Sequence, residues 1–164
     1  MKSKLHIVHT QDAPRVERSP HESFQCAWLG LTPDLPGRKL GAGLFCVQPG
    51  LSAVPHHRHH GNDEAIYVLR GNGTLRLDQE QHQIGPGDYV ALPARGPAHR
   101  LTNTGSEPLE YLCFSTMQSP EVVDYPDSGK VGCYSRQPIL KQEQGGRGAV
   151  LFRSTESVDY YEGE

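Results

Sequence analysis

Four histidines stand within five residues in the segment HHRHH, at positions 56–60. Side chains in an extended chain alternate between two faces, so His57 and His59 point one way and the other three residues point the other way. Two imidazoles on one face of a strand, two residues apart, can bind a single metal ion. The segment therefore predicts the first half of a metal site.

A carboxylate and a further histidine can complete that site. Glu64 lies five residues after His59, an odd offset that would place it on the opposite face of a straight strand. The dipeptide Gly61-Asn62 is typical of a turn, so we expect the chain to return there and bring Glu64 beside the two histidines. His99 opens another predicted strand after a proline-bounded loop, and an antiparallel neighbour can bring it close to the first pair.

Together these residues form a mixed nitrogen and oxygen donor set: His57, His59, Glu64 and His99. Such a set suits a divalent transition metal, namely Fe, Mn, Ni, Co or Zn, and leaves an octahedral ion two positions for water or substrate. Iron beside an electron-rich chelate would give a dioxygenase, whereas Zn, Mn or Ni would act as a Lewis acid in an isomerase, decarboxylase or lyase. A module that binds a metabolite without converting it stays open, because side-chain alternation alone identifies no acid or base beyond these four residues.

These side chains need a scaffold of short strands. Eighteen glycines and thirteen prolines in 164 residues interrupt the chain too often for long helices, and apolar or β-branched runs recur between them. This all-β pattern is typical of a sandwich or a barrel. The predicted strands cover residues 24–29, 42–48, 65–69, 74–77, 81–84, 89–92, 99–103 and 109–115.

Two segments resemble the two motifs of the cupin superfamily. The first motif joins a glycine, a His-x-His pair, a glutamate and a closing glycine, which here are Gly50, His57, His59, Glu64 and Gly71, with one extra residue before the pair. The second motif joins a glycine, a proline, a loop glycine, a histidine and an asparagine, which here are Gly87, Pro93, Gly96, His99 and Asn103, with a loop one residue longer than usual. The resemblance implies a double-stranded β-helix, or jelly-roll cupin barrel, that holds a divalent metal through the four residues above and binds a small metabolite.

The resemblance also divides the chain into three parts. We expect residues 1–40 to form an arm that supplies edge strands or dimer contacts, 41–116 to form the barrel, and 117–164 to form an extension that packs on it. The segments DYPDSGK at 124–130 and DYYEGE at 159–164 are similar to segments of single-domain bacterial cupins without an assigned reaction, so no substrate is implied. The extension is expected either to wrap the outside of the barrel or to cap its mouth.

Composition limits the partners. A net charge of -3 and a pI near 6.3 lack the electrostatic footprint of a nucleic-acid binder. No apolar run reaches the roughly 18 residues of a membrane span, and no apolar run follows the lysines near the N-terminus. Four dispersed cysteines suit a reducing compartment. We therefore expect a cytoplasmic protein that binds a small molecule and forms a homodimer through edge strands of the N-terminal arm.

For several polar side chains outside the four-residue set, the sequence supports only general expectations. His56 and His60 are expected at the surface or in a supporting layer that orients the ligating imidazoles. Tyr160 and Tyr161 favour packing or a dimer contact over a lid. Asp63, Arg76 and Lys39 are expected to be solvated.

Overall fold

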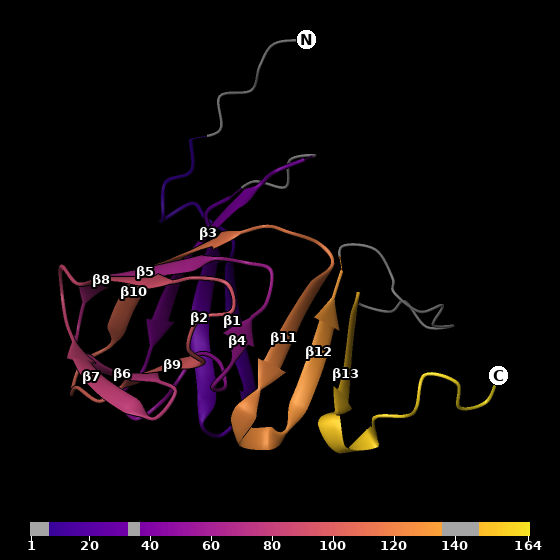
Figure 1. The fold of residues 1–164 in the computed structure, drawn as a ribbon. Helices are drawn as coiled ribbons and strands as arrows, with labels where there is room; N and C mark the ends of the chain where they lie inside the picture. The colour runs from indigo at the N-terminus through magenta and orange to yellow at the C-terminus, as the bar shows by residue number, and fades with distance from the viewer. Residues whose placement is uncertain (1–6, 33–36, 136–147) are drawn as a thin grey trace, which may run out of the picture.

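The computed structural model describes residues 7–32, 37–135 and 148–164. Strands dominate these residues (Figure 1), and the helical elements among them are two single turns, η1 (Pro126–Ser128) and η2 (Ser154–Glu156). No helix in the described part of the chain is long and apolar enough to cross a membrane. The parts of the expected arm and extension at 1–6, 33–36 and 136–147 lie outside the described residues.

The strands form three sheets (Figure 1). The largest has the order β1-β2-β3-β10-β5-β8 and contains β1 (Arg15–His21), β2 (Phe24–Gly30), β3 (Leu40–Val47), β10 (Leu109–Thr116), β5 (Glu64–Arg70) and β8 (Tyr89–Leu92). A three-stranded sheet contains β7 (Glu80–Ile84), β6 (Gly73–Leu77) and β9 (His99–Asn103). A four-stranded sheet contains β13 (Ala149–Arg153), β12 (Lys130–Tyr134), β11 (Glu121–Tyr125) and β4 (Arg58–His59).

The predicted all-β class is confirmed. Each of the eight predicted strands is present, with its ends displaced by no more than two residues. The other five described strands were not among these eight: β1 is an edge strand of the six-stranded sheet, and the four-stranded sheet contains β4, β11, β12 and β13.

Strand alternation explains how the barrel buries its core. Val68 and Ile66 on β5 are buried, whereas Tyr67 and Leu69 between and beyond them are exposed. Val47, Leu75 and Leu109 bury their side chains from neighbouring strands against the same cluster. Glu64 shares the parity of Ile66 and Val68, so β5 begins with a carboxylate on its inward face.

The two flanking segments attach to the barrel in different ways. β1 and β2 pair as a hairpin, and β2 continues into the barrel by pairing with β3, so the N-terminal segment extends the six-stranded sheet. The C-terminal strands β11, β12 and β13 lie side by side beyond β4 (Figure 1). β11 pairs directly with β4, with Val123 opposite His59 and Asp124 opposite Arg58. The C-terminal segment therefore forms a sheet with the strand that contains His59.

Candidate metal centre

The four predicted ligand residues converge in the fold. One side-chain donor atom from each of His57, His59, Glu64 and His99 lies within 4.8 Å of the others. His57 and His99 are held side by side by two backbone hydrogen bonds, from His57 N to His99 O at 3.1 Å and from His99 N to His57 O at 2.7 Å. Their ring centroids are 4.4 Å apart. We call these four residues the metal cluster.

The chain bends between His59 and Glu64, as expected, but β4 and β5 belong to different sheets and do not form a hairpin. Asn62 fixes this bend. The side-chain oxygen of Asn62 accepts hydrogen bonds from Gln118 N at 2.7 Å and from the Thr116 hydroxyl at 3.2 Å, while its amide donates to Glu121. Asn62 is buried, so these bonds satisfy a side chain that has little access to water. The predicted return of Glu64 toward the histidines therefore depends on contacts with the C-terminal segment.

Hydrogen bonds aim the imidazole nitrogens at one point. The ring Nδ1 of His57 donates to the carbonyl of Pro55 at 2.8 Å, which leaves the lone pair of its Nε2 for a ligand. The Nε2 atoms of His59 and His99 lie 3.4 and 3.3 Å from the same oxygen of Glu64. Three ring nitrogens and one carboxylate thus face a common centre.

The protonation of the cluster follows from burial and mutual contact. Burial, followed by the neighbouring His99 and His59, lowers the pKa of His57 to about 4, so His57 is a neutral imidazole at pH 7. Burial opposes the charge of Glu64, but hydrogen bonds from His59 and His99 outweigh it and lower the pKa of this carboxyl below its usual value. Burial also opposes the charge of His59, but Glu64 and Glu121 outweigh it and raise the pKa of His59.

This donor set fits a divalent transition metal. Neutral imidazole nitrogen and carboxylate oxygen are the ligand types that such ions combine in proteins. One carboxylate oxygen of Glu64 also lies 3.4 and 3.3 Å from the Nε2 atoms of His59 and His99, so the donor atoms of these residues already face one another. The metal cluster is accordingly the set of residues that would hold the ion.

Glu121 is a site residue that sequence reasoning missed. It lies on β11 in the C-terminal segment, is only 6% exposed, and approaches the Nδ1 of His59 at 3.5 Å. Its Oε1 accepts hydrogen bonds from the backbone N–H groups of His60 and Gly61, both at 3.1 Å. A carboxylate behind a ligating imidazole orients the ring and makes it a better ligand. The alternating residues of the EVVDY segment indicate a strand, but they do not indicate which strand it pairs with.

The outward residues of HHRHH face away from the metal cluster, as their parity predicts, and they contact the C-terminal segment. The guanidinium of Arg58 donates two 3.0 Å hydrogen bonds to Asp124, and the ring of His60 contacts Asp124 at 2.8 Å. His56 is not at the surface: it is 2% exposed and its Nδ1 lies 3.3 Å from Asp127. Both histidines thus belong to the attachment of this segment rather than to the metal cluster.

Other residues singled out by the sequence do not reach the cluster. Tyr160 and Tyr161 are 86% and 75% exposed. Arg76 pairs with Asp127 at 2.9 Å, so it is not simply solvated. Asp63 is exposed, as expected, although one of its oxygens accepts a hydrogen bond from Ala94 N.

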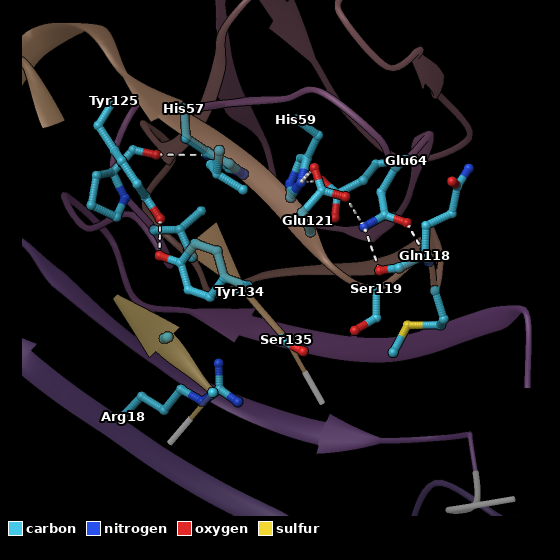
Figure 2. Close-up of a pocket in the computed structure, with 17 residues that line it drawn as sticks. Arg18, His57, His59, Glu64, Gln118, Ser119, Glu121, Tyr125, Tyr134 and Ser135 are labelled. Carbon is cyan, nitrogen blue, oxygen red and sulfur yellow. Dashed lines mark hydrogen bonds and ion pairs between the residues drawn. The ribbon is translucent and has the colours of Figure 1, made fainter. Parts of the chain in front are cut away.

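A cavity of about 740 Å³ opens beside the metal cluster. His57, His59 and Glu64 line one part of it, and the inward side chains of β11 and β12 line another (Figure 2). Residues 121, 123 and 125 alternate onto this face of β11, opposite the outward residues 122 and 124. The C-terminal segment is therefore a wall of the cavity as well as a cover for the barrel.

Two tyrosines of that wall form a pair. The hydroxyls of Tyr125 and Tyr134 are hydrogen-bonded to each other (Figure 2), and the Tyr125 ring lies at 27° to that of His57 with 6.2 Å between centroids. The ring of Tyr134 lies back over Gly132, where a β-carbon would meet its Cε2 at 2.6 Å. Burial, followed by the bond to Tyr134, raises the pKa of Tyr125, so the Tyr125 hydroxyl keeps its proton at pH 7.

Comparison with known proteins agrees with the fold and the motifs. Residues 43–115 match the family model described as a cupin domain. The oxalate-binding protein of Thermotoga maritima is 36% identical over 66 residues, which are 40% of this chain and 53% of that protein. The chain spans about half the length of the curated relatives it matches.

Two solved structures match nearly the whole chain. A structure from Acidithiobacillus ferrooxidans, named as a candidate sugar phosphate isomerase, has a TM-score of 0.77 and 26% identity, and the match covers 95% of this chain and 97% of that one. A sugar phosphate isomerase structure from Silicibacter pomeroyi has a TM-score of 0.76 and 23% identity over 92% and 94% of the two chains. These matches extend beyond residues 43–115 into both flanking segments.

Proposed function

We propose that this chain, which belongs to the cupin superfamily, is a divalent-metal-dependent enzyme of the isomerase type that acts on a small hydroxy-carbonyl compound. The observation that carries the proposal is the convergence of three imidazoles and one carboxylate within 4.8 Å, at the wall of a cavity that a small metabolite fits. Fe, Mn, Ni, Co and Zn all suit this donor set.

The comparisons support the isomerase type over the other reactions that the donor set allows. The likeness to the Acidithiobacillus structure includes the C-terminal segment, which forms part of the cavity wall here. The likeness to the oxalate-binding protein covers only 40% of the chain. An isomerisation also needs no second reactant, whereas a dioxygenase would need molecular oxygen.

Each part of the site has a task in such a reaction. The bound ion would supply Lewis-acid chemistry, polarising a carbonyl oxygen. His57, His59, Glu64 and His99 would hold the ion, and Glu121 would keep the ring of His59 oriented. The covering strands β11 and β12 would exclude bulk water from one side of the substrate.

The hydroxyl pair can move the proton that passes between the two substrate oxygens in an isomerisation. Exchange of an aldehyde and a ketone moves one hydrogen between two carbons and one proton between their oxygens, with no net oxidation. Tyr125 and Tyr134 carry two hydroxyl protons, and their mutual hydrogen bond uses one of them. The second proton is free to be given to one substrate oxygen while the pair accepts a proton from the other.

A homodimer in the cytoplasm remains part of this proposal. β1 and β13 are edge strands with exposed apolar side chains, including Val16 on β1 and Phe152 on β13. An exposed edge of this kind is a site for pairing with a second copy. Four cysteines without disulfides suit a reducing compartment. Light scattering at micromolar concentration that gives the mass of one chain would reject the dimer.

A second candidate is a module that binds a small acid without converting it. It is favoured by the 36% identity to the oxalate-binding protein over a segment of the barrel. The two candidates differ in one measurable respect, because only an enzyme changes the ligand that it releases.

The deciding experiment combines elemental analysis with turnover. Protein purified without chelator or nickel resin is analysed for bound transition metals, then incubated with a panel of aldose and ketose phosphates and followed by NMR. The isomerase proposal expects a stoichiometric metal and the appearance of the isomeric sugar. Saturable oxalate binding with no conversion of any panel member would favour the binding module.

A further inference from the structure

Arg18 lines the same cavity from the N-terminal strand β1. Five other arginines each lie within 4.0 Å of a carboxylate, namely Arg15, Arg58, Arg70, Arg76 and Arg100. Among the described residues, no carboxylate lies that close to Arg18. Its guanidinium therefore lines the cavity without an acidic partner in the part of the chain that the structure describes.

A platform holds this guanidinium in place. Arg18 lies over the ring of Trp28, with 4.7 Å between the guanidinium carbon and the ring centroid. The indole ring lies against Gly30 and Gly43, which face each other across β2 and β3. A β-carbon at Gly30 would meet the ring at 2.8 Å, and one at Gly43 would collide with the indole nitrogen. The absence of side chains at both positions lets the ring lie flat on the sheet with Arg18 above it.

The other charges that line the cavity are already engaged. Glu64 contacts His59 and His99, and Glu121 accepts hydrogen bonds from the turn that follows His59. Figure 2 shows Arg18 on the far side of Tyr134 from the histidines in that view. The cavity thus has the metal cluster in one part and a fixed, planar cation in another.

A guanidinium stacked on an aromatic ring keeps its N–H edge free. That edge matches the paired oxygens of a phosphate or a carboxylate, which it binds through two parallel hydrogen bonds. We propose that Arg18, supported by Trp28, is the anion-binding end of the cavity, and that the ligand carries a phosphate or carboxylate group remote from the metal cluster. This inference rests on the proposed function and narrows its substrate to anionic hydroxy-carbonyl compounds.

The protein has a built-in reporter for this site, because Trp28 is its only tryptophan. Full-length protein is titrated with a hexose 6-phosphate, with the corresponding hexonate and with the uncharged hexose, while tryptophan fluorescence and heat of binding are recorded. We expect saturable binding of at least one of the two anions, at least about tenfold tighter than binding of the hexose. Comparison of the phosphate and the hexonate shows which anion the site prefers.

Substitution then assigns the effect to Arg18. Arg18→Met should weaken binding of the preferred anion about tenfold or more and leave the hexose unaffected, whereas Arg18→Lys should retain part of the affinity. Arg70→Met is the matched control, since Arg70 is an exposed arginine paired with Glu107 away from the cavity. Because Arg18 is exposed, its replacement should leave the fold intact, which circular dichroism verifies.

Equal anion affinity in the wild type and Arg18→Met would overturn the inference, as would the absence of saturable binding of either anion. Its failure is distinguishable from failure of the proposed function. If the metal-loaded protein isomerises a sugar phosphate with the same KM in Arg18→Met, the function stands and the anion site falls. If anion binding depends on Arg18 but no panel compound is converted, the anion site stands and the isomerase falls.

Discussion

The carboxylate of Glu121 lies 3.5 Å from the Nδ1 of His59, although 62 residues separate them in the chain (121 − 59). The contact arises because β11 pairs with β4 and places Val123 opposite His59, so Glu121 falls on the same face two residues earlier. The C-terminal segment is thereby joined to the metal cluster by a side chain as well as by backbone hydrogen bonds. This relationship gives the segment a testable part in metal binding.

Replacing Glu121 should weaken the metal site without removing a ligand. In Glu121→Gln the amide oxygen can still accept the N–H groups of His60 and Gly61, but the acceptor for the Asn62 amide and the negative charge behind His59 are lost. We expect a loss of metal affinity of about 10- to 100-fold, measured by competition with a chelator of known affinity. The control variant is Glu107→Gln, which changes an exposed carboxylate paired with Arg70. It should bind the metal as tightly as the wild type does. Equal affinity in the two variants would show that Glu121 acts only on the fold.

The two faces of HHRHH should respond differently to alanine. His57→Ala removes a residue of the metal cluster, whereas His60→Ala removes a ring that contacts Asp124 on the outside. Because a ligand that binds the folded state stabilises it, added Zn or Mn should raise the Tm of the wild type and of His60→Ala. The same addition should leave the Tm of His57→Ala nearly unchanged. A metal-induced rise of equal size in His57→Ala would contradict its assignment as a ligand.

The hydroxyl pair depends on the absence of a side chain at Gly132. A β-carbon there would meet Tyr134 at 2.6 Å, so Gly132→Ala should displace the ring and break its bond with Tyr125. We expect Gly132→Ala to lower turnover about as much as Tyr134→Phe does, on the order of 10²-fold if the pair moves the proton. Metal affinity should stay near the wild-type value in both variants, since neither residue belongs to the metal cluster. Unchanged turnover in Tyr134→Phe would remove the pair from the chemistry.

The sequence was sufficient to predict the features of the structure that depend on local periodicity. The parity of His57 and His59 follows from a repeat of two. Turn residues predicted the return of Glu64, although contacts of Asn62 with the C-terminal segment hold it. His99 was proposed as an antiparallel neighbour of the histidine pair and then supported by the motif resemblance, because local periodicity does not specify a bridge to His57 between residues 42 positions apart (99 − 57). The eight predicted strands are present because short apolar runs bounded by turn residues are also local features of the sequence.

Sequence reasoning missed the features that depend on remote pairing. β4 is only two residues long, and its pairing with β11 places Glu121 and Tyr125 at the cavity. No local pattern specifies which strand a segment such as EVVDY will join. His56 was assigned by parity to the outward face, but its burial against Asp127 comes from the same remote attachment. The sequence therefore did not decide whether the C-terminal segment wraps the outside of the barrel or caps its mouth. In the structure, its strands pair with β4 and also line the cavity.

The attachment of β11 to β4 should be sensitive to acid. Burial opposes the charge of Asp124, but hydrogen bonds from Arg58 and His60 outweigh it and hold the pKa of Asp124 below its usual value. A carboxyl whose pKa is lowered by folding stabilises the protein above its unfolded pKa of about 4, and this contribution is lost as the pH falls through the folded pKa. Asp124→Asn should therefore lower the free energy of unfolding at pH 7 by about 1 kcal/mol.

The pH dependence of the stability difference between the wild type and Asp124→Asn serves as the control. The difference in unfolding free energy between wild type and Asp124→Asn should be constant from pH 7 to about pH 5 and shrink below about pH 4. Urea unfolding at a series of pH values measures it. A difference that stays the same at acid pH would mean that the Asp124 charge does not contribute to stability.

Two motif glycines should differ in how strictly they are required. Gly71 and Gly87 both have left-handed backbone, with φ of 77° and 94°, so a side chain is strained at either position. A β-carbon at Gly87 would have no atom within 4 Å, whereas one at Gly71 would meet the carbonyl oxygen of Pro108 at 2.5 Å. Gly87→Ala should therefore cost about 1 kcal/mol for the backbone alone, and Gly71→Ala about 1–3 kcal/mol more, because a backbone atom must move. Urea unfolding of both variants tests the difference, and equal losses would show that the turn at Gly71 relaxes without resistance from the neighbouring chain.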